Sequence, residues 1–260
     1  MIGQARSTQR YRTFQRNDEE LRLALIRLAR QYGRYGYRKI TALLRIEGWR
    51  VNHKKVERLW REEGLQVPRR HKQRKRLYDH VHSVIHMRPL YPHHIWSVDF
   101  VQDRLLHGRP YKMLTVIDEY TRQCLTVKAQ FQMGSQEVLE TLGDLFIHHD
   151  KPDYVRSDNG SEFKAQGIQQ WLKSVGVQPI YIYPGSPWGN GYNERFNGTL
   201  RNEVLNTEAF YSLQEARCVI QQWVEQYNHT RPHQSLNYRP PIPETTTPAL
   251  SQTLVHTQGA

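Results

Sequence analysis

Cysteine is nearly absent from this chain of 260 residues, which contains only Cys124 and Cys218. Two cysteines are too few for a disulfide framework, and these two do not have the spacing of a metal-binding pair. The chain also lacks any apolar run close to the roughly 20 residues that a membrane-spanning helix needs, and its first residues lack the apolar core of a signal peptide. We therefore expect a cytoplasmic protein without disulfides, membrane segment or export signal.

The thirteen histidines have no paired cysteines beside them. His80, His82 and His86, and the neighbours His93 and His94, invite a zinc hypothesis. A structural zinc site normally recruits cysteines at C-x2-C spacing, and the sequence has none. We interpret these histidines as surface or phosphate-facing side chains.

Acidic residues are scarce in the first ninety positions, which contain 23 Lys and Arg against 8 Asp and Glu, a net charge of +15. Residues 91–260 contain 14 against 17 and carry −3, so the whole chain carries +12. Such an excess indicates a polyanionic partner, because Lys and Arg that neutralise phosphates release condensed counterions. Solvated charged helices would show a more even mixture of signs. The front of the chain is therefore predicted to bind nucleic acid.

Three helices are predicted between Asn17 and Gly64, with Asn52 as the cap of the third. The third helix carries four basic residues within about 120° of one another, opposite its apolar stripe: Lys54, Lys55, Arg58 and Arg61. A compact unit of this kind fits a helix-turn-helix whose last helix enters the major groove. A small helical bundle with a solvated basic face is the alternative.

A basic linker follows, in which positions 69–76 hold six positive charges, among them Arg69 and Arg70. We expect it to track DNA phosphates. The predicted organisation is an N-terminal basic tail (1–16), a helix-turn-helix domain (17–65), the linker (66–90), a catalytic domain (91–232) and a C-terminal tail (233–260).

The catalytic domain is predicted to be an α/β fold with a mixed five-stranded sheet flanked by helices. Three strands in close succession form a meander, and later strands alternate with helices. The predicted strands are 95–101, 111–118, 124–127, 154–157 and 178–182. The predicted helices are 135–149, 165–176, 190–206 and 212–228.

Three carboxylates lie in separate segments of this domain: Asp99 within a strand, Asp158 after a strand, and Glu194 in a helix. Each alone has a plainer explanation, as a salt bridge, an ordinary turn or a solvated helix face. Together they indicate a two-metal phosphoryl-transfer site, in which hard oxygen ligands hold two divalent cations about 3.5–4 Å apart. Asn197 and Arg201 share the helix face of Glu194 to within about 60° and suit a grip on the neighbouring phosphate.

These motifs resemble a known family. The resemblance rests on Asp99, the run 158–163 (DNGSEF) and the run 189–197 (GNGYNERFN), with thirty-five residues between Asp158 and Glu194. On these motifs the chain closely resembles the DDE catalytic domain of retroviral integrases and bacterial insertion-sequence transposases. Arg201 matches the basic position of that signature. The runs 227–233 (YNHTRPH) and 238–241 (YRPP) narrow the resemblance to the second-reading-frame product of an IS-three group transposase, over roughly residues 17–245.

The resemblance implies a ribonuclease-H-like core in which Asp99, Asp158 and Glu194 bind two Mg²⁺ or Mn²⁺ ions. Water and then a 3′-hydroxyl would attack in line, so that element ends are nicked and joined to another strand. Asn197 and Arg201, with Lys54, Lys55 and Arg58, would hold DNA. The family also implies action on the bacterial nucleoid, a homo-oligomer on DNA, and partnership or fusion with a first-frame product.

One other function stays open at this point. The chain shows no sustained heptad pattern of the kind that pairs subunits in the fused enzyme, so a non-catalytic DNA-binding regulator or accessory product of the same element is the alternative. A glycosidase would use two carboxylates. It would leave the third acid and the basic front of the chain without a role.

Overall fold

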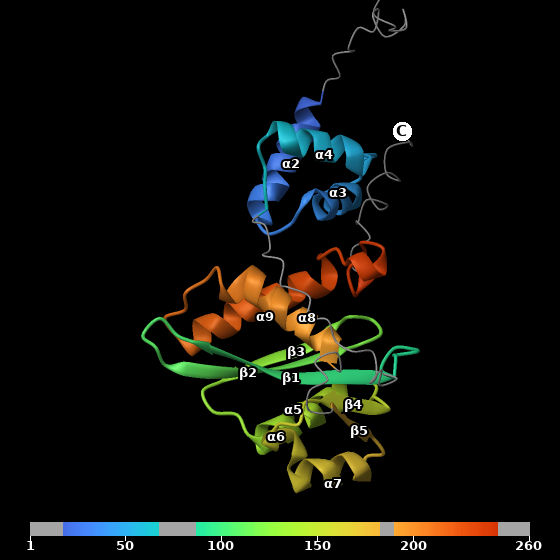
Figure 1. Ribbon diagram of the computed structural model, residues 1–260, viewed down its shortest axis with the longest axis vertical. Helices are drawn as coiled ribbons and strands as arrows, with labels where there is room; N and C mark the ends of the chain where they lie inside the picture. Colours follow the sequence, from blue (N-terminus) through green and yellow to red (C-terminus); the bar gives the residue numbers. More distant parts are fainter. Residues whose placement is uncertain (1–17, 68–86, 183–189, 244–260) are drawn as a thin grey trace, which may run out of the picture. The chain divides into compact units, whose positions relative to one another are not determined.

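The computed structural model describes residues 18–67, 87–182 and 190–243 and divides the chain into two units, Met1–Arg69 and Arg70–Ala260 (Figure 1). The predicted N-terminal tail, most of the linker with Arg69 and Arg70, and most of the C-terminal tail lie outside the described residues. The predicted domain boundaries therefore stay predictions, and each unit is described by itself.

The described part of the front unit, residues 18–67, contains three helices, as the apolar spacing predicts: α2 (Glu19–Gln31), α3 (Tyr37–Ile46) and α4 (His53–Glu62). Leu21, Leu25 and Leu28 are buried at helical spacing on α2 and pack with the buried faces of the other two helices. The side chain of Asn52 accepts a hydrogen bond from the Lys54 backbone N–H at 3.0 Å, so it caps α4. The expected helical front unit is confirmed.

The second unit is built on a five-stranded sheet in the order β3-β2-β1-β4-β5. The strands are β1 (Ile95–Arg104), β2 (Pro110–Asp118), β3 (Cys124–Gln130), β4 (Tyr154–Ser157) and β5 (Gln178–Tyr181). The first three pair antiparallel, whereas β1 with β4 and β4 with β5 pair parallel. The predicted mixed sheet is confirmed. β1 runs three residues further than predicted because its polar end still pairs with the start of β2.

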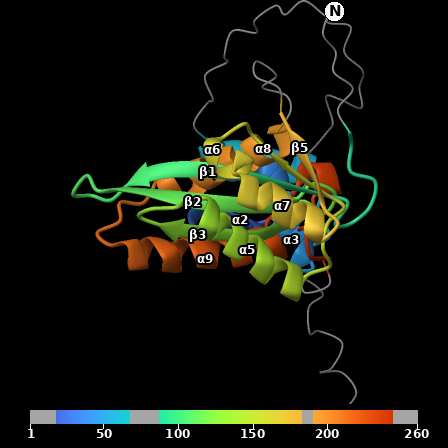
Figure 2. The same ribbon diagram turned by 90° about the horizontal axis from the view of Figure 1, so that it is seen from below.

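Helices cover both faces of this sheet. They are α5 (Ser135–His148), α6 (Ser161–Lys164), α7 (Gln166–Ser174), α8 (Gly191–Leu200) and α9 (Leu213–His229), with a π-helical turn at Arg201–Leu205 and a 3₁₀ turn at Gln234–Leu236. α8 and α9 lie on one face (Figure 1), and α5 and α7 lie across the other (Figure 2). The helix predicted at 165–176 is α7, and the short α6 before it was missed.

Alternate side chains of β1 enter two different cores, one on each face of the sheet. Trp96 and Val98 pack with residues of α5 and α7, whereas Val101 packs with residues of α8 and α9. Because strand side chains alternate, Asp99 shares the face of Val101. The sheet therefore presents this carboxylate toward α8. Among the helices that the structure describes, none is long and apolar enough to cross a membrane.

Candidate functional site

Asp99 sits in the middle of β1, partly buried, with both carboxylate oxygens occupied by hydrogen bonds. Oδ1 accepts the Phe100 backbone N–H at 2.8 Å, and Oδ2 accepts the side-chain amide of Asn197 at 2.9 Å. Burial is the main cause that raises the pKa of Asp99 to about 6, and the negative charges of Asp158 and Glu194 raise it further. Like charges act in this way only at short range. The pairing of β1 with β4 and the hydrogen bond from Asn197 of α8 to Asp99 place the three predicted acids in the same region of the fold.

Asp158 reaches this region because β4 is the parallel neighbour of β1. Ser97 on β1 pairs with Arg156 on β4, so two residues further along both strands the chain arrives at Asp99 and Asp158. The side chain of Asp158 is exposed, and its Oδ1 accepts the Gly160 backbone N–H at 3.0 Å. A Cβ atom at Gly160 would lie 3.0 Å from the same oxygen. The glycine therefore allows the tight turn that directs this carboxylate.

Glu194 is exposed on the first turn of α8, and its two helix neighbours fix it against the sheet. Asn193 is fully buried, and its Oδ1 accepts the hydroxyl of Thr115 at 3.0 Å. Thr115 is the residue of β2 that pairs directly with Asp99. Asn197, one turn further along, donates to Asp99 itself. Two amides on one face of α8 thus set the place of Glu194 relative to the other acids.

The residues present fit divalent cations in chemistry. Three carboxylates supply hard oxygen donors. A cation bound among them would balance their negative charges. The buried Oδ1 of Asn197, beside Asp99, has no hydrogen-bond partner. Within the described ranges, no three His, Cys, Asp or Glu side chains already stand close enough to hold a metal ion. The acids are therefore neighbours without forming a closed coordination shell.

Asn197 and Arg201, both predicted to hold DNA, differ in their surroundings. Asn197 is buried against Asp99, which makes it a group that orients a carboxylate. Arg201 is exposed at the start of the π-helical turn and donates from Nη2 to the Gln102 carbonyl at 2.8 Å. The DNA-binding role of both residues stays a prediction.

A fully buried ion pair supports the strand that carries Asp158. Arg156 donates from Nη1 to both carboxylate oxygens of Glu119, at 2.8 and 2.7 Å, and their side chains are 4% and 0% exposed. Ser97 also donates to Glu119, and Arg156 Nη2 donates to the Met87 carbonyl at 2.7 Å. The pair joins the end of β2 to β4, two residues before the catalytic candidate.

Sequence reasoning missed Asn193, Thr115 and the pair Glu119–Arg156. Two signals were available. Asn193 and Asn197 are amides four residues apart on the apolar face of a short helix, and Arg156 is a charge inside a short strand. Either pattern indicates a buried polar partner, although neither identifies which residue it is.

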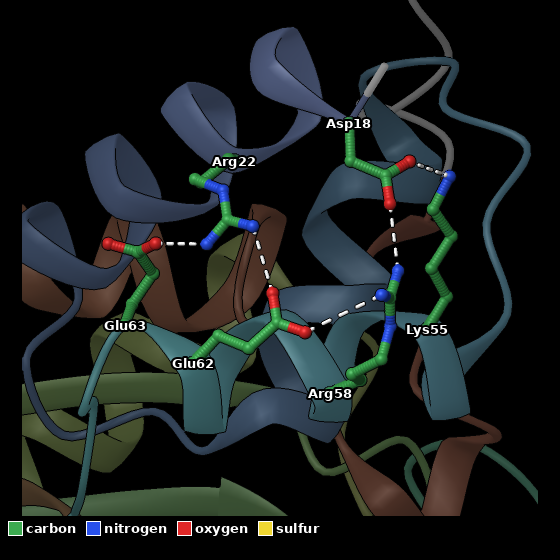
Figure 3. A network of polar contacts seen from close by, with 6 residues as sticks. All are labelled: Asp18, Arg22, Lys55, Arg58, Glu62 and Glu63. Atoms are coloured by element: carbon green, nitrogen blue, oxygen red, sulfur yellow. Dashed lines mark hydrogen bonds and ion pairs between the residues drawn. The ribbon is translucent and has the colours of Figure 1, made fainter. Parts of the chain in front are cut away.

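The predicted basic face of α4 is only partly free. Lys55 and Arg58 both pair with Asp18, which precedes α2 (Figure 3). Arg61 pairs with Glu57 on its own helix. Lys54 is exposed, and its ammonium group contacts no acid among the residues that the structure describes. The four predicted DNA-binding residues of α4 therefore do not form one uniform basic surface.

Comparison with known proteins agrees with this arrangement of two units. The HTH-like domain family matches residues 15–73, and two integrase core domain families match residues 90–187 and 175–241. A protein of the insertion element IS407 from Burkholderia multivorans is 37% identical over 242 residues, which cover 93% of this chain and 86% of the relative. The chain is a member of the insertion-sequence transposase family. The resemblance read from its motifs is confirmed.

Other transposases and solved structures also match this chain. The transposase for the insertion sequence element IS904 from Lactococcus lactis is 28% identical over 223 residues, covering 80% of this chain and 86% of that transposase. Among solved structures, the HTLV-2 integrase catalytic core domain in complex with magnesium is 22% identical, with a TM-score of 0.46, over 56% of this transposase-family chain and 92% of the integrase chain.

Proposed function

We propose that this protein catalyses metal-dependent strand cleavage and strand transfer at the ends of an insertion sequence, with Asp99, Asp158 and Glu194 as metal ligands. The observation that carries the proposal is that the pairing of β1 with β4 brings Asp158 beside Asp99, while Asn197, one turn after Glu194 on α8, donates to Asp99, in a chain that belongs to a DNA-transposing family. Two Mg²⁺ or Mn²⁺ ions bound there would activate the attacking oxygen and stabilise the leaving oxygen.

The chain's own residues provide the geometry. The Phe100 N–H and the Asn197 amide fix the orientation of Asp99. The Gly160 N–H directs the Asp158 carboxylate. Fixed carboxylates hold ligands in place without reorganising during the reaction, and this preorganisation is how a rigid site lowers a barrier.

Arg201 lies seven residues after Glu194, directly after α8. It supplies a positive charge for the DNA strand that enters the site. The front unit and the basic linker, with Arg69 and Arg70, supply further contacts to element ends and target DNA. Action as a homo-oligomer on DNA, with the first-frame product or as a fusion with it, belongs to the same proposal. So does action in the bacterial cytoplasm, where nucleoid DNA is found.

The test is strand transfer on a branched DNA that mimics a joined product, because such a substrate needs little recognition of element ends. Wild type is compared with Glu194→Gln and with Glu208→Gln, an exposed glutamate in the loop after the π-helical turn, in Mg²⁺ and in Mn²⁺. We expect Glu194→Gln to lose strand transfer and keep DNA binding, and Glu208→Gln to keep both.

Equal activity of wild type and Glu194→Gln would refute the catalytic assignment. Wild type that binds the branched DNA and transfers no strand in either metal would favour the non-catalytic regulator. In that case the intact acids would serve another purpose in this chain.

A further inference from the structure

The positive charges of α4 are divided between those used inside the front unit and those left free. Six side chains from the start of α2 and from α4 form a continuous series of ion pairs, called here the Asp18 network (Figure 3): Asp18, Arg22, Lys55, Arg58, Glu62 and Glu63. Three of its members are acids and three are bases, so the network has no net charge. Its cations are already balanced by acids of the same unit.

Asp18 is the member that commits Lys55 and Arg58 to the network. Its side chain is only 8% exposed, with Lys55 Nζ 2.6 Å and Arg58 Nη2 2.8 Å from its two oxygens. Moving both cations onto a phosphate would leave a nearly buried carboxylate without a partner, which is costly. The contact with Lys55, supported by Arg58, holds the pKa of Asp18 below its usual range despite burial. The carboxylate therefore stays charged near neutral pH and keeps both cations.

The basic residues outside this network lie just before α4, on its first turn and in its last turn. Arg50 precedes the cap Asn52, and Lys54 is on the first turn of α4; both are exposed. Neither side chain forms an ion pair or hydrogen bond within the described part of the front unit. Arg61 pairs with Glu57 on the surface, and its side chain is 77% exposed. Such a pair is weak and is screened by salt, so it does not hold Arg61 in the way that Asp18 holds Lys55.

We infer that duplex DNA meets the front unit at the N-terminal end of α4, through Arg50 and Lys54, and that Lys55 and Arg58 are structural residues that make no phosphate contact. This inference rests on the proposed function for DNA as the partner. It assigns different roles to two adjacent lysines: Lys54 contacts DNA, and Lys55 stabilises the front unit. It also agrees with the docking of helix-turn-helix units, in which the N-terminal residues of the recognition helix contact the DNA.

The experiment compares Lys54→Ala with Lys55→Ala in the full chain, because the two variants lose the same charge at neighbouring positions. Affinity for a fluorescent duplex is measured by anisotropy across a range of salt concentrations, and thermal unfolding is followed by circular dichroism. Loss of one phosphate contact lowers the magnitude of the log–log salt slope by about 0.9, which corresponds to about eightfold weaker binding at 0.1 M salt. We expect this change for Lys54→Ala alone. We expect a lower melting temperature for Lys55→Ala alone.

A second matched pair, Arg50→Ala and Arg58→Ala, keeps the test decisive if Lys55→Ala does not fold. Arg58→Ala leaves Lys55 on Asp18, so the front unit retains a partner for the carboxylate. Arg50→Ala is expected to lower the salt slope and Arg58→Ala to leave it unchanged. Equal loss of slope within either pair would overturn the inference while leaving the proposed function intact. A wild-type chain that binds no duplex at all would overturn both.

Discussion

Replacing Arg156 with methionine is the sharpest test of how the second unit, which carries the three acids, is held together. The variant keeps most of the side-chain volume and removes the guanidinium group, so Glu119 is left 0% exposed with only Ser97 donating to its carboxylate. Three hydrogen bonds from Arg156 are lost, two of them to the charged Glu119. The change therefore isolates the cost of an unpaired buried carboxylate.

The expected loss of stability is about 3–5 kcal/mol, because removing one partner of a buried ion pair leaves an uncompensated charge. The double variant Arg156→Met with Glu119→Leu removes both charges. Since apolar replacement of a whole buried pair is often close to neutral, we expect it to recover most of that loss, to within about 1–2 kcal/mol of wild type. Urea unfolding followed by tryptophan fluorescence measures both differences.

The loss should also depend on pH. Burial raises the pKa of Glu119, and Arg156 is the main group that opposes this rise. In Arg156→Met the folded-state pKa of Glu119 therefore rises further above its unfolded value. The folded variant then binds more protons than the unfolded chain between those two values, so its stability falls as pH rises through that window. We expect a larger deficit at pH 8 than at pH 5. A deficit under about 1 kcal/mol, well below the range for a broken buried pair, or one independent of pH, would refute this account.

Two further predictions concern the turn that carries Asp158 and the start of the front unit. Gly160→Ala should reduce strand transfer by about 10–100-fold, because it displaces the Asp158 carboxylate. The control Gly167→Ala should keep strand transfer, because its added Cβ meets nothing within 4 Å. Equal activity of the two variants would contradict the role of the turn. Asp18→Asn should lower the melting temperature of the front unit by about 4–8 °C, for a loss of about 1 kcal/mol. The pKa of Asp18 is lowered in the folded state. The difference in melting temperature between wild type and Asp18→Asn should therefore be full above the unfolded-state pKa and vanish as pH falls through the folded-state pKa. A difference that persists at low pH would exclude the ion pairs as its cause.

Residues with regular spacing carried most of what the sequence could predict. In the predicted strand 95–101, the alternation of strand side chains puts Asp99 on the opposite face from Trp96 and Val98, and the structure agrees. Apolar periodicity and the cap Asn52 located the front helices. Such signals are local, because each is set by backbone geometry within a few residues. α6 has four residues, too short for a periodic pattern to appear.

Long-range partners could not be predicted in the same way. Lys55 and Arg58 look free on a helical projection, and the acid that neutralises them, Asp18, lies about forty residues earlier in the chain. Asn197 was placed correctly beside Glu194 on one helix face, yet its bond to Asp99 crosses to another element. Which charges are free is decided by tertiary pairing, and a single sequence does not record that pairing.

The central claim is that Asp99, Asp158 and Glu194 form one metal site, and Mn²⁺ binding tests it most directly. The paramagnetic resonance signal of free Mn²⁺ would be titrated against wild type, Asp99→Asn and the control Glu208→Gln. Since loss of even a group that only hydrogen-bonds to a metal ligand typically weakens metal binding by about 10–100-fold, we expect at least that loss for Asp99→Asn and none for the control. Unchanged Mn²⁺ affinity in Asp99→Asn would contradict the claim.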